Sequence, residues 1–461
     1  MITSAIIPKP LARLPWRLIF LVAAIAMFGL IVLYSAAGGS AEPWAVKQGI
    51  VFLFFLAVAI GMSWMSESTI KSIAFPLYGI TMVLLIGVEA LGFVSKGAQR
   101  WLELGPVKLQ PSEFMKPAIV LTLARFYELV PAGEIRKWRA VWPAFVLLGV
   151  PALLILVQPD LGTCIVVALC GVTVMFLAGL PIWIFLVPAA AVAAAAPVVY
   201  HLMHGYQRKR IDVFLDPESD PLGAGYHIAQ SKIAIGSGGI WGKGFLHGSQ
   251  SHLDYLPEGH TDFVFATMAE EWGLVGGVLL ILAFAMVIRW GMSVSINARS
   301  RFGQLAAAGL SATIFFYVAI NLMMVTGLAP VVGVPLPLVS FGGSAVMTVM
   351  LCLGLLMALE RQQRTGSRLS LICGGCAPSE AMLPARRSSA ATRPAHPRKR
   401  GRIAQLVEQL TLNQRVLGSS PSASTIFPVD ILGKSSQLTS CRNSQEWCKG
   451  TILGNDSVEQ S

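Results

Sequence analysis

Three of the four carboxylates in PEGHTDFVFATMAEEWG, residues 257–273, lie at the start of an apolar run or inside it, namely Asp262, Glu270 and Glu271. The chain otherwise keeps charge out of its apolar runs. An ionisable side chain in a membrane segment costs roughly 2.5–3.5 kcal/mol on insertion scales and is a functional candidate by default. Asp262 can cap the helix that follows, although Asn or Ser would serve equally well as a cap. Glu270 lies about 80° around that helix and about 12 Å deeper, so it could line the same cavity. Glu271 points to nearly the opposite side and should meet either another helix or the membrane interface, and the sequence assigns it no role.

Two further clusters place charge at predicted helix starts. In GAQRWLELGPVKLQPSEFMK, residues 97–116, Glu113 falls in a first turn and Lys116 lies three residues later on the same helix face. A structural ion pair that anchors the helix and a ligand-binding pair are both compatible with this spacing. Asp160 in QPDLGT is an ordinary N-cap for the next helix, and it could also face a cavity shared with the first cluster.

The long polar segment 204–261 carries the cations that could bind an anion. Arg208 and Arg210 are suited to grip phosphate oxygens in a forked geometry, and Lys232 follows in the same segment. Charge runs are usually solvated, so a basic face held in water is an equally good interpretation of each one. The run GSGGIWGKG resembles a phosphate-cradling loop, but no strand precedes it and no βαβ unit surrounds it. Its backbone amides could still contact an anion.

The composition indicates the kind of protein that positions these groups. The 461 residues are 54% hydrophobic and only 13% charged, with a mean hydropathy of +0.65. Soluble domains are about 25% charged, so this is the composition of a polytopic membrane protein. The net charge of +11 lies mostly after residue 361, which argues against a nucleic-acid partner. The seven cysteines form no disulfide framework, and CGGC at 373–376 lacks a second pair at a zinc spacing.

Hydropathy predicts an all-α polytopic fold with about ten transmembrane helices, since a span needs about 20 mostly apolar residues. The predicted spans are Trp16–Tyr34, Gln48–Trp64, Ile73–Leu91, Glu113–Phe126, Ala140–Val157, Gly162–Leu180, Ile182–Met203, Asp262–Ile288, Gln304–Thr326 and Phe341–Leu359. The distribution of Lys and Arg in short loops favours a cytoplasmic N-terminus, which makes the loop between the seventh and eighth spans external. Lys and Arg are normally less frequent in external loops, so an anionic ligand would explain the basic residues of this loop.

The chain changes character near residue 362. Residues 1–361 contain every predicted span, whereas Ser, Arg, Pro and Ala dominate residues 362–461, which we predict to be a disordered tail. The stretch RIAQLVEQLTLNQRVLGSSPSAS resembles out-of-frame translation of a transfer-RNA gene. A frameshift or read-through could have appended this tail, and we assign it no part in the function.

From about residue 16 to 361 the chain resembles the SEDS family of bacterial membrane glycosyltransferases, which polymerise peptidoglycan from lipid II. The resemblance rests on GAQRWLELGPVKLQPSEFMK, QPDLGT, FLDPESDPLGAGYHIAQSKIAIGSGG, LPEGHTDFVFATMAEEWG and PLPLVSFGGS, in that order. SQSHLDYLPEGHTDFVF and the region around residues 96–99 resemble the elongation branch, RodA, more than the septal branch, FtsW. Trp272 stands where leucine is commoner in the family, and the tail has no family counterpart.

The resemblance implies the chemistry and the site. Asp262 in HTDF would be the catalytic carboxylate, acting as general base on the 4-hydroxyl of the acceptor sugar. Glu113, Lys116 and Asp160 match positions that line the family's external cavity, and Glu270 would support it. The diphosphate of lipid II would be stabilised by Lys116, Arg208, Arg210 or Lys232, or by a divalent cation such as Mg²⁺ or Mn²⁺.

The resemblance also implies the setting. The expected location is the bacterial inner membrane, with the active site facing the periplasm. The expected partners are lipid II, a class B penicillin-binding protein, other proteins of the elongation machinery and membrane lipids. Two alternatives from other functional classes stay open, namely a lipid II flippase and a non-catalytic scaffold. The charged cluster at one face, with no clear inverted repeat, favours the enzyme over a transporter.

Overall fold

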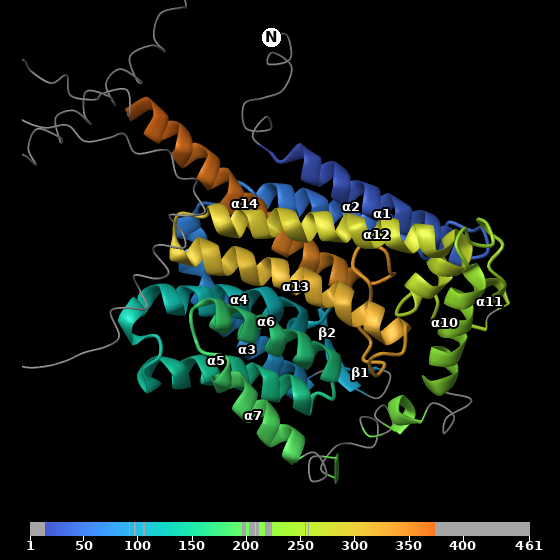
Figure 1. Cartoon of the computed structure of the whole chain (residues 1–461), viewed down its shortest axis with the longest axis horizontal. Helices are drawn as coiled ribbons and strands as arrows, with labels where there is room; N and C mark the ends of the chain where they lie inside the picture. Colours follow the sequence, from blue (N-terminus) through green and yellow to red (C-terminus); the bar gives the residue numbers. More distant parts are fainter. Residues whose placement is uncertain are drawn as a thin grey trace, which may run out of the picture. The chain divides into compact units, whose positions relative to one another are not determined.

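The computed structural model describes residues 14–91, 93–95, 98–104, 107–195, 200–201, 208, 212–216, 224–253, 255–256 and 258–373. These residues form twelve α-helices, one 3-10 helix and three strands (Figure 1). The helices are α1 (Trp16–Ala36), α2 (Ala45–Met62), α3 (Glu67–Leu91), α4 (Pro111–Leu129), α5 (Trp138–Val157), α6 (Leu161–Leu177), α7 (Trp183–Ala194), α10 (Ala224–Gly238), α11 (Ser249–His252), α12 (Val264–Asn297), α13 (Arg301–Val325) and α14 (Gly343–Cys373). The 3-10 helix η2 covers Ala132–Glu134.

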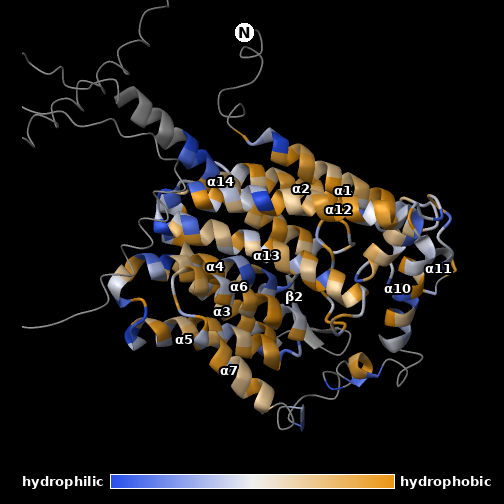
Figure 2. Ribbon diagram, in the orientation of Figure 1, coloured by the Kyte–Doolittle hydropathy of each residue, from blue (hydrophilic) through white to orange (hydrophobic). Residues whose placement is uncertain are grey.

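Each of the ten predicted spans overlaps one helix, namely α1 to α7 and α12 to α14. Seven of these helices are long and apolar enough to cross a membrane: α1, α2, α3, α5, α12, α13 and α14. α6 and α7 are apolar but shorter, and α4 carries Glu113, Lys116, Arg125 and Glu128 among its 19 residues. Hydrophobic residues cover the helices along most of their length (Figure 2). The prediction of an all-helical, multi-pass membrane protein is confirmed.

The centre of the bundle is formed by α4, α13 and α14. Most of α4 is buried, and α13 and α14 are buried over most of their apolar windows, whereas α2 and α3 leave most of theirs exposed. α4 packs against α3, α6, α13 and α14, and α14 also packs against α2. Polar side chains on α4 and α13 therefore face other protein groups, which must satisfy their hydrogen bonds.

A small antiparallel sheet, which the sequence analysis did not predict, lies between α3 and α4. Its strands are β1 (Phe93–Ser95), β2 (Ala98–Leu104) and β3 (Val107–Leu109), in the order β1-β2-β3. Trp101 pairs with Phe93, and Leu102 pairs with Leu109. This sheet leads directly into α4, which begins with a proline in its first turn, a position that favours a helix start.

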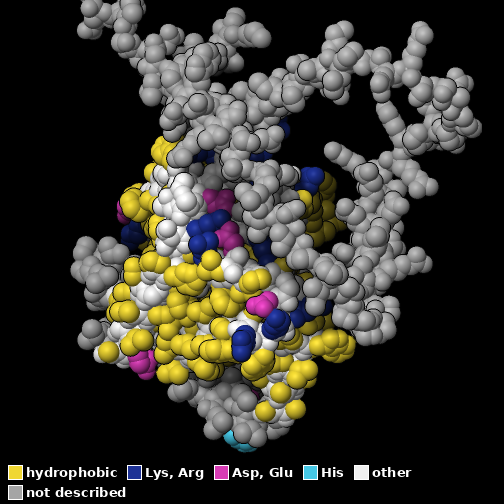
Figure 3. Space-filling model, turned by 90° about the vertical axis from the view of Figure 1, so that its left-hand side faces the viewer, with side chains coloured by type: hydrophobic (Ala, Val, Ile, Leu, Met, Phe, Trp, Pro, Cys, Tyr) yellow, Lys and Arg dark blue, Asp and Glu magenta, His cyan; other side chains and the backbone are white. Residues whose placement is uncertain are grey.

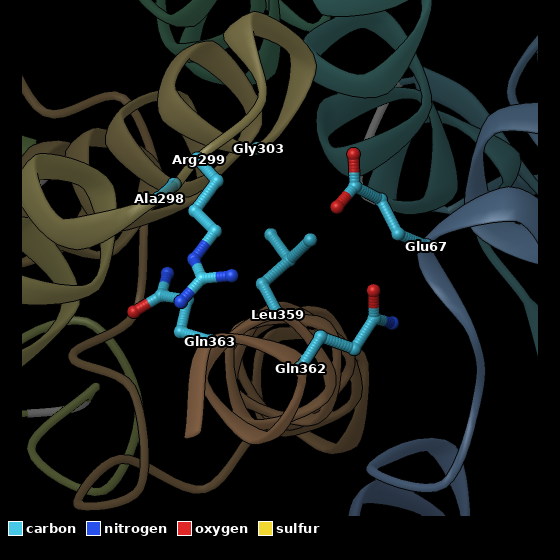
Figure 4. A pocket seen from close by; sticks show the side chains of 7 residues that line it. All are labelled: Glu67, Ala298, Arg299, Gly303, Leu359, Gln362 and Gln363. Atoms are coloured by element: carbon cyan, nitrogen blue, oxygen red, sulfur yellow. The ribbon is translucent and has the colours of Figure 1, made fainter. Parts of the chain in front are cut away.

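The C-terminal part of α14 projects from one end of the bundle (Figure 1). At this end, Lys and Arg side chains lie beside Asp and Glu side chains (Figure 3). Lys71 of α3 forms ion pairs with Glu67 and Glu128, at 2.8 and 2.6 Å. A pocket of about 150 Å³ lies at the same end, between the start of α3, the α12–α13 turn and α14 (Figure 4). It is lined by Glu67, Ala298, Arg299, Gly303, Leu359, Gln362 and Gln363, none of which was predicted as a site residue.

The predicted domain boundary, the predicted tail and the predicted long loop can each be compared with the described residues. α14 continues to Cys373 and so passes the predicted domain boundary at residue 361. Residues 374–461 lie outside the described residues, and the disordered tail stays a prediction. The predicted loop between the seventh and eighth spans corresponds to the connection from α7 to α12, which contains α10 and α11.

Candidate active site

Asp262 lies in the turn formed by residues 258–263, immediately before α12, and its side chain is partly exposed. The turn closes on Glu258, whose carbonyl accepts hydrogen bonds from the backbone N–H groups of Thr261 (3.1 Å) and Phe263 (3.3 Å). The Thr261 hydroxyl also donates to Glu258 Oε2 at 2.6 Å. Asp262 thus belongs to a compact turn and does not occupy the N-cap position of α12, which is Phe263.

Three backbone carbonyls of this turn accept hydrogen bonds from three different elements. Thr267 Oγ1 of α12 donates to Gly259 O (3.2 Å), the Phe341 N–H between α13 and α14 donates to His260 O (2.9 Å), and Asn321 Nδ2 of α13 donates to Asp262 O (3.0 Å). The ring of His260 also stacks on Trp44, with ring centroids 4.0 Å apart. The backbone around Asp262 is therefore fixed from several directions, which is what a positioned catalytic group requires.

The stretch Val332–Val334, between α13 and α14, connects Asp262 with the start of α6. A Cβ added to Gly333 would lie 3.6 Å from Asp262 Oδ2, so the carboxylate lies beside this backbone. A Cβ added to Gly162 would lie only 2.5 Å from the Val332 carbonyl oxygen, so the start of α6 packs on the same stretch. The structure thereby brings the QPDLGT and HTDF motifs to a common segment.

Asp160 caps α6, as its position after a proline predicted. Its Oδ1 accepts a hydrogen bond from the Thr163 N–H (3.2 Å), and the residue is 4% exposed. Its Oδ2 accepts a hydrogen bond from Gln110 Nε2 (3.1 Å), and Gln110 is the residue that precedes α4. One carboxylate therefore joins the starts of α6 and α4. Its predicted contact with substrate stays a prediction.

Glu113 and Lys116 form a buried ion pair, with Lys116 Nζ 2.6 Å from Glu113 Oε1. Lys116 also donates to the Tyr317 hydroxyl (2.5 Å), which in turn donates to Glu113 Oε2. Thr348 of α14 donates to the same Oε2 at 2.6 Å. Glu113 is 6% exposed and Lys116 1%, so this network lies inside the protein and joins α4, α13 and α14.

Sequence reasoning missed several residues on which this geometry depends. Tyr317 and Asn321 lie in the apolar run of α13, and Thr348 lies in that of α14; all three are fully buried. Asn321 also donates to the Val334 carbonyl (2.8 Å), so one amide group holds both the Asp262 turn and the neighbouring stretch. The signal that could have found them is a hydrogen-bonding side chain inside an apolar span, because such a group needs a partner.

α12 is interrupted at Gly273, whose backbone angles (φ 64°, ψ −164°) are not helical. A break leaves backbone groups on both sides without helical partners, and the glycine-rich loop supplies them. The N–H groups of Lys243 and Gly244 donate to the carbonyls of Glu270 and Glu271 (3.0 and 3.1 Å), and those of Leu274 and Val275 donate to the carbonyls of Gly239 and Ile240 (2.9 and 3.2 Å). A Cβ on Gly242 would lie 2.1 Å from Glu271 O, so only glycine permits this approach.

The paired acids of α12 point to different partners. Glu270 is fully buried and accepts hydrogen bonds from Lys243 Nζ (2.6 Å), Ser249 Oγ (3.1 Å) and the Gln250 N–H (3.0 Å). Glu271 accepts a hydrogen bond from Ser35 at the end of α1, which agrees with the first of the two surroundings predicted for it, another helix or the interface. The predicted role of Glu270 in lining the Asp262 cavity stays a prediction.

The predicted cations of the long loop differ in their surroundings. Lys232 is exposed on α10, and a Cβ on Gly327 would lie 2.7 Å from its Nζ, at the C-terminal end of α13, where a helix favours positive charge. Within the described part of the chain its ammonium has no hydrogen-bond or ion-pair partner. Arg208 donates to the carbonyls of Tyr200 (2.7 Å) and His201. Arg210 lies outside the described residues.

The described residues contain no group of three or more His, Cys, Asp or Glu side chains that could hold a metal ion. The donor set around Asp262 therefore does not by itself make a metal site within these residues. The divalent cation stays a prediction, and no step proposed below depends on it.

The chain matches the FTSW_RODA_SPOVE family model, described as "Cell cycle protein", over residues 16–365. The chain belongs to this family. It is 45% identical over 352 residues to "Peptidoglycan glycosyltransferase MrdB" of Escherichia coli K12, a match that covers 76% of this chain and 94% of that protein. This is the SEDS family that the motifs indicated, and MrdB is a member of its RodA branch.

Two solved structures share the fold. One, described as "Structural coordination of polymerization and crosslinking by a peptidoglycan synthase complex", is 33% identical with a TM-score of 0.66 and covers 76% of this chain and 98% of that chain. The other is the crystal structure of the Thermus thermophilus rod shape determining protein RodA, 29% identical with a TM-score of 0.58, covering 76% of this chain and 97% of that chain. Both matches support the all-helical membrane fold.

Proposed function

We propose that Asp262 is the general base with which this SEDS peptidoglycan glycosyltransferase polymerises lipid II into glycan strands. Asp262 would take the proton from the acceptor 4-hydroxyl as that oxygen bonds to the anomeric carbon of the donor sugar. The lipid diphosphate then leaves without needing a strong protein acid, because it is already a good leaving group. The observation that carries the proposal is a partly exposed carboxylate on a turn held through three backbone carbonyls.

The substrate's diphosphate requires positive charge, and Lys232 is the best-supported candidate to supply it. Its ammonium is exposed and lacks a partner within the described residues, so it is available to an anion. Arg208 already donates to two backbone carbonyls, and part of its donor capacity is used. Lys116 is fully engaged with Glu113 and Tyr317, which makes it a weaker candidate than its sequence position suggested.

We infer that the protein lies in the bacterial inner membrane with its N-terminus in the cytoplasm and Asp262 at the periplasmic face. The support is the distribution of Lys and Arg, together with the family's role in cell-wall synthesis. Leu215, in the α7–α12 connection, is exposed, as is Glu134 between α4 and α5. A membrane-impermeant maleimide should label Leu215→Cys but not Glu134→Cys in intact spheroplasts. The opposite pattern would reverse the topology.

We also propose that the protein works with a class B penicillin-binding protein and with other proteins of the elongation machinery. The support is the similarity to a structure whose description concerns polymerization and crosslinking by a peptidoglycan synthase complex. A scaffolding role would coexist with catalysis in such an assembly. Co-purification with a penicillin-binding protein of this class would support the assembly, and its failure would leave the catalytic proposal standing.

The decisive experiment incubates purified protein with fluorescent lipid II, with and without the partner. The enzyme hypothesis predicts glycan polymer from the wild type and polymerisation at least about 100-fold slower from Asp262→Asn. A flippase would move lipid II across proteoliposomes without forming polymer, and a scaffold would do neither. Glu134→Gln, which removes an exposed carboxylate far along the chain from the site, is the matched control and should polymerise normally.

A further inference from the structure

Residues 243–270 form a closed ring that contains Asp262. The ring is closed twice between its first and last residues. The Lys243 N–H donates to the Glu270 carbonyl at 3.0 Å, and Lys243 Nζ lies 2.6 Å from Glu270 Oε1. The turn that carries Asp262 therefore belongs to a chain segment whose two ends contact each other.

Glu270 is the group on which the closure depends. It is fully buried, and the donors to its carboxylate among the described residues all come from the stretch 243–250. The Gln250 N–H approaches both oxygens, at 3.0 and 3.2 Å, and Lys243 Nζ also donates to Ser249 at 2.7 Å. A buried carboxylate surrounded by donors from one loop holds that loop, and its oxygens are already occupied.

The closure coincides with the break in α12 at Gly273. The helical segment from Val264 to Trp272 is therefore short and cannot draw rigidity from a continuous helix below it. The N-terminal end of this segment is held by the Thr267 and Asn321 hydrogen bonds to the Asp262 turn. Its C-terminal end is held by residues 239–244, whose backbone hydrogen-bonds with α12 on both sides of Gly273, and by the contacts of the Glu270 carboxylate.

We propose that Glu270 is a positioning residue for Asp262, acting with Lys243 to fix the segment that carries the base. This inference rests on the proposed role of Asp262 and replaces direct substrate contact as the function of Glu270. The required chemistry is an anion at position 270 and a cation at position 243. Because reacting groups must be held to a fraction of an ångström, loosening the closure lowers the rate of the chemical step.

The test measures lipid II polymerisation kinetics per folded molecule for Glu270→Gln, Lys243→Met and Lys243→Arg. The first two should lower kcat by about 10- to 100-fold and leave KM for lipid II nearly unchanged, as expected for a displaced catalytic group. Lys243→Arg keeps the cation and should restore most of the rate. The double variant Glu270→Gln/Lys243→Met should be no slower than either single variant, because both break the same contact.

Other outcomes overturn the inference. A raised KM with an unchanged kcat would make Glu270 or Lys243 a substrate-binding group. A wild-type kcat per folded molecule, with only a lower yield or unfolding temperature, would leave the pair a purely structural role. Asp262→Asn run in parallel separates the two proposals. If Asp262→Asn polymerises at the wild-type rate, the proposed base is wrong; if it is slowed by about 100-fold or more while Glu270→Gln has wild-type kinetics, only the positioning role is wrong.

Discussion

Asp262 and Glu113 are both acids near the start of a helix, but they are held in different ways. Glu113 is held through its side chain, since Lys116, Tyr317 and Thr348 all donate to its carboxylate inside the protein. The turn of Asp262 is held through backbone carbonyls, and the carboxylate is partly exposed. An acid fixed by its backbone can present its side chain to a substrate, whereas an acid surrounded by donors stabilises the fold.

This difference separates two kinds of experimental outcome. A change in the Glu113 network should act first on stability, because it leaves a buried charge or hydroxyl group without its partner. A change at Asp262 should act on the reaction and leave folding intact. The predictions below test or refine this contrast.

The largest expected effect on stability is that of Lys116→Met. It removes one partner of a buried ion pair and should cost about 3–5 kcal/mol of folding free energy. Thermal unfolding of the detergent-solubilised protein measures it. The double variant Lys116→Met/Glu113→Gln removes both charges and should recover part of the loss. If Lys116→Met unfolded like the wild type but bound lipid II weakly, Lys116 would belong with Asp262 in the site.

Gly242→Ala should be the next most damaging change. Gly242 has φ 83°, and the added Cβ would lie 2.1 Å from the Glu271 carbonyl oxygen at the α12 break. We expect a loss of about 2–3 kcal/mol, since the backbone conformation and the close approach both oppose the side chain. Gly236→Ala in α10 is the matched control, because its Cβ would meet open space. It should be neutral or slightly stabilising. Equal unfolding temperatures for the two variants would contradict the loop's role in completing α12.

Asn321→Leu should affect both regions of the comparison, but moderately. It leaves the Asp262 and Val334 carbonyls without their donor, which should cost about 1–3 kcal/mol. Displacement of the turn should also slow polymerisation by about 10-fold. Unfolding and initial rates measured on one preparation give both numbers. Asn297→Leu, at the exposed end of α12, should change neither. A wild-type rate for Asn321→Leu would show that the frame around Asp262 is not needed.

The smallest expected effect is that of Lys137→Met. Its ion pair with Glu134 is 2.7 Å long, but both side chains are more than half exposed. Such surface pairs contribute about 0–1 kcal/mol, so stability and activity should both stay close to the wild type. A large loss of stability or activity in Lys137→Met would indicate that the effects of the other substitutions also reflect general damage to the helix bundle.

Much of this architecture could be predicted from the sequence, because apolar runs of about 20 residues identify helices well. The capping of α6 by Asp160 followed from local rules, whereas for Glu271 helix geometry left both another helix and the interface open. The environment of Glu270 could not be predicted in this way. It depends on the break of α12 at Gly273 and on backbone hydrogen bonds to residues 239–244, which are distant in the sequence. The Glu113 network also depends on Tyr317 and Thr348, whose positions follow from helix packing and not from spacing along α4.

The most direct test compares Asp262→Asn with the wild type in rate per folded molecule. Asn keeps the size of the side chain and the backbone carbonyl that Asn321 holds, but it cannot accept a proton. The account predicts an unchanged unfolding temperature and a polymerisation rate lower by about 100- to 10,000-fold, the usual contribution of a general base. A folded Asp262→Asn protein that polymerises lipid II at the wild-type rate would contradict it.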